Sequence, residues 1–131
     1  MDIQKNKGDD CMKGILILAH GSREKATEST LYKIVGDLKE KLSDCIVETA
    51  FLQFSDTTLK VGLDKLKDQG INEIKVIPYF LFEGVHIRED IPKEIDDYLK
   101  ENLNMKISLG KTLGYDERLV EILSDRVRET L

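Results

Sequence analysis

The chain has 131 residues, a net charge of −5 and 34% charged residues, which fits one domain with a highly charged surface. This acidic balance argues against nucleic acid as a partner, because binding to a phosphate backbone requires an excess of Lys and Arg. The longest apolar runs fall far short of the ~20 residues that a membrane helix needs, so we expect no membrane partner.

Residues 1–13 are polar and lack the apolar stretch of a signal peptide, so we expect a flexible leader followed by one domain at 14–131. The two cysteines, Cys11 and Cys45, are too few for a disulfide framework and do not have the spacing of a zinc site. We expect two free thiols in a reducing compartment, which favours a cytoplasmic location.

Within the domain, short apolar runs alternate with segments of helical periodicity, a pattern typical of a parallel sheet covered by helices. The apolar runs predict four strands, at 15–19, 46–54, 74–82 and 106–109. Pro78 is the weak point of the third strand, because proline cannot donate a hydrogen bond to a neighbouring strand.

Each strand is followed by apolar residues at helical spacing, which predicts four helices with one buried face each. Asp90 and Pro92 are the start signals of the third helix. The predicted fold class is α/β, with a single-layer, four-stranded parallel sheet flanked by helices. The residues on the four helical faces are Leu31, Ile34, Val35, Leu38 and Leu42, then Leu59, Leu63 and Leu66, then Ile91, Ile95 and Leu99, and finally Leu119, Leu123 and Val127.

Right-handed crossovers predict the strand order 2-1-3-4, in which the carboxyl ends of the first and third strands border a ligand-binding crevice. The two histidines of the chain, His20 and His86, follow these two strands, and we expect their imidazoles to face each other. Two imidazoles bind Co, Ni, Fe or Zn and leave coordination positions open, which suits transfer of a metal ion. For each histidine alone, a loop residue with a local hydrogen bond is the alternative.

Two carboxylates and two arginines are predicted near the same edge. Asp56 follows the second strand and Glu83 precedes His86, and either carboxylate can take or relay a proton. Asp56 is equally suited to cap the next helix, and Glu83 to be a solvated loop charge. Arg23 and Arg88 add positive charge, which favours an anionic substrate such as a polycarboxylate.

The sequence lacks the motifs of several other enzyme classes. Gly110-Lys111-Thr112 resembles the end of a phosphate-binding loop, but Met105 stands where that loop needs a glycine. No G-x-G-x-x-G motif for a dinucleotide occurs. A histidine phosphatase would need an arginine in place of Ala19 to hold its phosphate.

Four segments together resemble a known family. They are LAHGSR at 18–23, VETAFLQF at 47–54, VIPYFLFEGVH at 76–86 and DIP at 90–92. Together these segments resemble the small class II chelatases, which insert a divalent metal ion into sirohydrochlorin. The resemblance extends from Gly14 to about Val127. It implies a chelatase-like fold, equivalent to one half of a two-lobed class II chelatase, and a homodimer.

The resemblance also implies roles for individual residues. His20 and His86 match the metal-binding and catalytic pair, and His20 also matches the proton acceptor. Asp56 stands where relatives often carry a glutamate, although Thr57 replaces the proline that frequently follows it. The expected substrate contacts are Asp56, the tetrapyrrole-facing segment Leu81, Phe82, Glu83, Gly84 and Val85, and Ser22, Arg23 and Arg88 near the acidic groups of the substrate.

The implied function is ATP-independent insertion of a divalent metal ion into sirohydrochlorin, in the biosynthesis of a cobalamin-type tetrapyrrole cofactor. Cobalt is the first choice of metal, with nickel or iron as alternatives, because two imidazoles accept all three. The metal is a substrate, and we expect no tightly bound cofactor. The alternative is a carrier that binds a metal or a tetrapyrrole without turnover.

Overall fold

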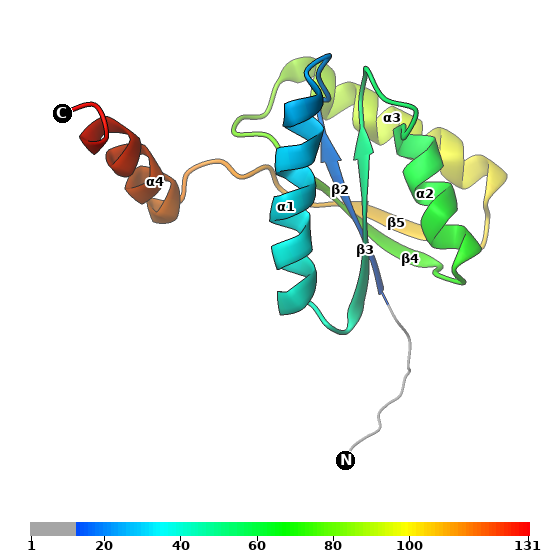
Figure 1. Cartoon of the computed structure of the whole chain (residues 1–131). Helices are drawn as coiled ribbons and strands as arrows, with labels where there is room; N and C mark the ends of the chain where they lie inside the picture. The colour runs from blue at the N-terminus through cyan, green and yellow to red at the C-terminus, as the bar shows by residue number, and fades with distance from the viewer. Residues whose placement is uncertain (1–12) are drawn as a thin grey trace.

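The computed structural model describes residues 13–131, with His86 described by its backbone alone. Strands and helices alternate along this part of the chain (Figure 1). The predicted leader lies outside the described residues up to position 12, and its last residue, Lys13, already belongs to the first strand. The elements are β2 (Lys13–Ala19), α1 (Lys25–Lys41), β3 (Cys45–Phe51), α2 (Leu59–Asp68), β4 (Glu73–Pro78), α3 (Val85–Glu101), β5 (Lys106–Leu109) and α4 (Glu117–Arg128).

The four strands form one parallel sheet in the order β3-β2-β4-β5, which confirms the predicted order. Leu18 of β2 lies opposite Ala50 of β3 and Pro78 of β4. The carboxyl ends of β2, β3 and β4 therefore reach the same edge of the sheet. The chain segments that follow these strands are brought together at this edge.

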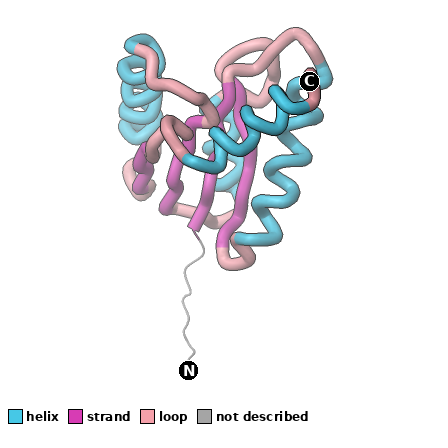
Figure 2. Tube along the Cα trace, turned by 90° about the vertical axis from the view of Figure 1, so that its left-hand side faces the viewer, coloured by secondary structure: helices cyan, strands magenta, loops and turns pink. Residues whose placement is uncertain are grey.

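The sheet has an apolar core on each face, as the helices on both sides of the strands in Figure 2 indicate. Leu16 and Leu18 of β2 pack with residues of α2 and α3 on one face. Ile17 and Ala19 pack on the other face, against the side of the sheet that α1 covers. Since successive side chains of a strand point to opposite faces, burial on both sides explains the uninterrupted apolar run.

Two predicted strands are too long. β4 ends at Pro78 instead of residue 82, although the N–H of Tyr79 still donates to the carbonyl of Leu18 in β2. β3 ends at Phe51 instead of residue 54, where the N–H of Phe51 donates to the carbonyl of Thr57 at 2.8 Å and closes a loop. The residues beyond both strands belong to the loops at the carboxyl edge.

The third helix begins earlier than predicted. α3 starts at Val85, and Pro92 lies inside it rather than at its start. An interior proline costs about 3 kcal/mol through its missing hydrogen bond and its ring. Burial of Ile91, Ile95 and Tyr98 against the sheet offsets this cost, at about 1.5–3 kcal/mol for each large apolar side chain.

The last helix does not bury the face predicted for it. α4 stands away from the sheet at the end of an extended segment (Figure 1) and contains no buried residue. Leu123 is 66% exposed and Val127 is 51% exposed. Within the described part of this chain, the apolar side of α4 is largely exposed. None of the helices between residues 13 and 131 has the length and apolarity required to cross a membrane.

Candidate functional site

His20 is the first residue after β2 and is held by the neighbouring loop. Its carbonyl accepts a hydrogen bond from the N–H of Gln53 at 3.1 Å, and the carbonyl of Ala19 accepts one from Leu52 at 2.9 Å. The exposed imidazole packs edge-on against the buried ring of Phe80, with 4.4 Å between the ring centroids. One side of the imidazole is therefore fixed by an apolar contact while the residue stays accessible from solvent.

Gly21 allows the loops after β2 and β3 to meet. Its φ is +86°, and a Cβ atom at this position would lie 2.0 Å from the carbonyl oxygen of Gln53. Only glycine has both this backbone conformation and the space for the approach. Gly21 thus makes room for the loop whose Gln53 N–H holds the carbonyl of His20.

His86 lies in the first turn of α3, after the Gly84 N-cap. The segment that leads from β4 to this turn continues the pairing with β2, because the N–H of Tyr79 donates to the carbonyl of Leu18 at 2.7 Å. Phe80, on the same segment, is the residue that touches His20. The side chain of His86 is outside what the structure describes. Among the described side chains, no three His, Cys, Asp or Glu residues gather as metal ligands.

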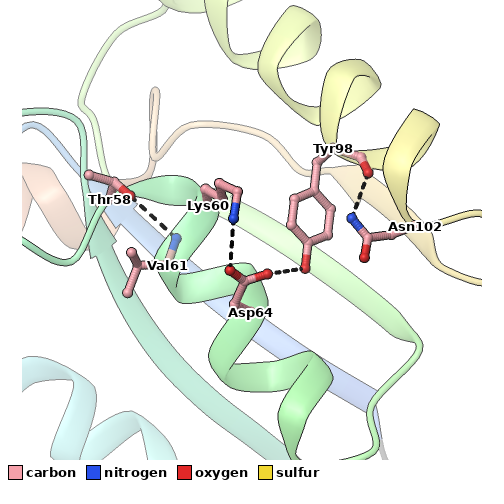
Figure 3. Close-up of polar contacts among 6 residues, drawn as sticks. All are labelled: Thr58, Lys60, Val61, Asp64, Tyr98 and Asn102. Carbon is pink, nitrogen blue, oxygen red and sulfur yellow. Dashed lines mark hydrogen bonds and ion pairs between the residues drawn. The ribbon is translucent and has the colours of Figure 1, made fainter.

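The two candidate carboxylates have different surroundings. Asp56 lies exposed in the loop after β3, and the N-cap of α2 is Thr58, whose hydroxyl accepts from the N–H of Val61 (Figure 3). The alternative role of Asp56 as this cap is therefore wrong. Glu83 lies 4.0 Å from the guanidinium of Arg88, and both side chains are more than half exposed. This ion pair partly neutralises both groups.

The loop before α3 exposes large apolar side chains. Leu81 is 50% exposed, Phe82 78% and Val85 59%. Leu81 and Phe82 form one wall of a groove of about 630 Å³, whose other wall includes Tyr115 and Leu119. A contiguous exposed apolar surface of this kind is typical of a binding site. This is the segment for which the family resemblance implied contact with the tetrapyrrole.

Ser22 and Arg23 begin the next turn, ahead of α1. The hydroxyl of Ser22 accepts from the N–H of Glu24 at 3.1 Å and so shapes the turn. The guanidinium carbon of Arg23 lies over the ring of Phe54, 4.8 Å from its centroid. Phe54 and Phe80 were absent from the predicted site, because no local pattern distinguishes a loop aromatic residue that supports a neighbour from one that packs in the core.

A separate polar network fastens α2 to α3 (Figure 3). The hydroxyl of Tyr98 donates to Asp64 at 2.7 Å, and the Lys60 ammonium donates to the same carboxylate at 3.1 Å. Desolvation raises the pKa of Asp64, but these two hydrogen bonds outweigh it and the pKa lies below its ordinary value. Burial and the Asp64 carboxylate raise the pKa of Tyr98. This network stabilises the frame that holds the site.

Comparison with known proteins identifies the family. The CbiX family model matches residues 14–130. A sirohydrochlorin cobaltochelatase from Sulfurisphaera tokodaii is 32% identical over 92% of this chain and 95% of that protein. A sirohydrochlorin ferrochelatase from Priestia megaterium is 31% identical over 92% of this chain, but over 46% of that longer protein. The chain thus spans about half the length of the ferrochelatase.

A solved structure agrees in fold. The sirohydrochlorin chelatase SirB from Bacillus subtilis subspecies spizizenii, in complex with cobalt, matches with a TM-score of 0.83 at 30% identity. The match covers 90% of this chain and 50% of that one. The family match over nearly the whole sequence and the shared fold lead to one conclusion: the chain belongs to the CbiX family, together with these sirohydrochlorin chelatases.

Proposed function

We propose that the chain is a sirohydrochlorin chelatase, which inserts a divalent metal ion into the tetrapyrrole without ATP. The position of His20 carries this proposal. It lies at the carboxyl end of β2, beside the segment from β4 that leads to His86 in the first turn of α3. Parallel α/β sheets bind ligands at this edge, where the loops of neighbouring strands diverge.

In this proposal, His20 and His86 hold the incoming metal ion, which is a substrate. Two neutral imidazoles leave most coordination positions open, so the ion can pass to the four nitrogens of the macrocycle. Two inner N–H bonds of sirohydrochlorin break as the metal–nitrogen bonds form, and two protons leave. His20 and the exposed carboxylate of Asp56 are the proposed proton acceptors, because both lie at the same edge of the sheet.

The macrocycle is proposed to lie against residues 81–85. Leu81, Phe82 and Val85 offer apolar surface that would otherwise face water, and a flat ring system covers such a surface well. Gly84 lets the ring approach the backbone at the start of α3. Arg23 and Arg88 then meet the carboxylates at the rim of the substrate, where Glu83 competes for Arg88.

We further propose that two copies form a homodimer through α4. The apolar face of this helix is uncovered, and a two-fold arrangement allows each copy to cover that of the other. Relatives of about twice the length, such as the Priestia megaterium protein, match this chain over only half of their sequence. In this proposal, a second copy of the chain takes the place of the other half of these longer relatives.

Sedimentation equilibrium tests the dimer. The parent chain should have the mass of two copies, and Leu123→Glu should have the mass of one, because the change places a charge on the uncovered apolar face. Glu121→Gln, on the same helix, is the matched control and should stay dimeric. A parent of single mass, or a Leu123→Glu variant of double mass, would contradict the proposed interface.

Cobalt is the metal that we propose, with nickel and iron as the alternatives to compare under the same conditions. The match to the cobaltochelatase relative covers 95% of that protein, which supports this choice. A cytoplasmic location stays a prediction from the cysteines. Cys45 is a free thiol, and Cys11 lies outside the described residues.

The activity is tested with sirohydrochlorin in excess over protein, with Co²⁺, by the change in tetrapyrrole absorption. We expect many metallated products per site, and a loss of about 10²-fold or more in rate for His20→Ala and His86→Ala. Lys33→Ala, an exposed change on α1, is the control and should match the parent. At most one product per site would indicate a carrier, and full activity in both histidine variants would refute the proposed site.

A further inference from the structure

The loops after β2 and β3 form one connected unit at the candidate site. The N–H of Gln53 donates to the carbonyl of His20, and Gly21 brings the two backbones together so closely that no side chain fits between them. A residue on the second loop is therefore held in a set position relative to the first loop. Phe54, the next residue after Gln53, is such a residue.

Phe54 has an unfavourable backbone conformation. Its φ is +60°, and it is the non-glycine residue with positive φ among the described residues. Bulky residues rarely adopt the left-handed region, because this conformation strains their backbone. The side chain gains little burial in return, since Phe54 is 48% exposed. A contribution to the core does not explain this conformation.

The strained backbone places the Phe54 ring beneath Arg23. The guanidinium carbon lies 4.8 Å from the ring centroid, within the range of a cation–π contact. A ring beneath a guanidinium group interacts with its face and leaves the N–H groups available to bind a carboxylate in bidentate geometry. Arg88, the other arginine predicted at this edge, already contacts Glu83. Of the two arginines, Arg23 is thus the one whose N–H groups are better placed to bind an acidic ligand.

We propose that Phe54 is a positioning residue that holds Arg23 ready to bind a peripheral carboxylate of the tetrapyrrole. The inference rests on the proposed function and deepens it, because it assigns one acidic side chain of the substrate to the loop that begins with His20. Phe54 acts through Arg23 and touches no reacting atom. Its effect therefore falls on substrate binding, while the rate at saturating substrate is spared.

Steady-state kinetics and direct titration with metal-free sirohydrochlorin test this role. Phe54→Leu keeps an apolar side chain but removes the aromatic face, and we expect it to raise KM and Kd for sirohydrochlorin about two- to fivefold. The turnover number should stay within about twofold of the parent. Phe54→Tyr retains the aromatic face and should restore parent binding. Tyr32→Leu removes an equally exposed aromatic residue from α1 and should change neither constant.

Arg23→Ala provides the second arm of the test. This variant should weaken sirohydrochlorin binding about tenfold or more, through loss of a charge-assisted hydrogen bond. Adding Phe54→Leu to Arg23→Ala should weaken it no further, because Phe54 acts through Arg23. The Kd of the parent should also rise more steeply with salt than that of Arg23→Ala, because one ion pair is already missing from the variant.

The outcomes separate this inference from the proposed function. If the parent binds and metallates sirohydrochlorin but Phe54→Leu binds it equally well, the role of Phe54 is wrong and the chelatase proposal stands. Additive effects of the two substitutions would also overturn the role of Phe54. If the parent neither binds nor metallates sirohydrochlorin, the proposed function fails, and the inference fails with it.

Discussion

Replacing Gly21 with alanine should destabilise the protein and displace His20. Two costs add at this position. An L-residue in the left-handed region costs roughly 1–2 kcal/mol, and a weakened hydrogen bond from Gln53 to His20 costs about 0.5–1.5 kcal/mol. The second cost arises because the new Cβ would lie 2.0 Å from the Gln53 carbonyl oxygen, so the two loops must separate. We expect a loss of about 1.5–3.5 kcal/mol in the free energy of unfolding.

Urea unfolding followed by circular dichroism measures this loss. With a urea m-value of about 1–3 kcal/mol/M, the midpoint should fall by about 0.5–3.5 M. Gly70→Ala is the first control, because Gly70 has a φ of +85° with no atom within 4 Å of an added Cβ and so isolates the backbone cost. Gly36→Ala is the second control. It lies in open space within α1 and should stabilise the chain by about 0.5–1 kcal/mol.

The comparison between the variants decides the matter. If Gly21→Ala is no more destabilising than Gly70→Ala, the close approach of the two loops contributes nothing and the reasoning is refuted. Metal insertion, measured without urea where the variant stays folded, should fall together with stability, because His20 loses its backbone anchor. Parent activity in a destabilised Gly21→Ala variant would show that this anchor is unnecessary.

Three further changes test the frame. Tyr98→Phe should cost about 1 kcal/mol in urea unfolding, since Asp64 is partly exposed and regains water. This difference should shrink below about pH 4, because stabilisation from a depressed carboxyl pKa is lost as the pH falls through it. Thr58→Ala removes the α2 cap and should cost about 1 kcal/mol by the same assay. Gly62→Ala should lower the thermal midpoint, because its Cβ would lie 3.0 Å from that of Ala50, and an unchanged or higher midpoint would contradict the packing.

The sheet and its ligand edge could be predicted because they follow from local patterns and one rule of handedness. The run before His20 is apolar at consecutive positions, which is the pattern of a strand buried on both faces. Right-handed crossovers then place this strand beside β4, as observed. The position of His20 at the carboxyl edge followed directly. Residues 81 and 82 were predicted as strand, and only the family resemblance implied a role for segment 81–85.

Element boundaries and the fate of α4 were less predictable. Pro92 is locally a good signal for the start of a helix. The helix nevertheless begins at Val85 and continues past Pro92, because burial of the residues around the proline stabilises it. The apolar stripe of α4 predicted a buried face, and the stripe is present but exposed within this chain. A periodic apolar pattern predicts that one face of a helix is covered, but it does not indicate which surface covers that face.

The amino-acid sequence by itself determined that a histidine follows a buried strand and that the neighbouring strand leads to the segment of the second histidine. Hydrophobic periodicity and chain handedness are sufficient for this much. Only the tertiary structure decided that Gln53 and Phe80 hold His20 and that Phe54 lies beneath Arg23. These contacts join loops that are distant in the chain, and they depend on a left-handed backbone at Gly21 and Phe54. Such contacts arise from the meeting of loops, and no property of either loop alone reveals them.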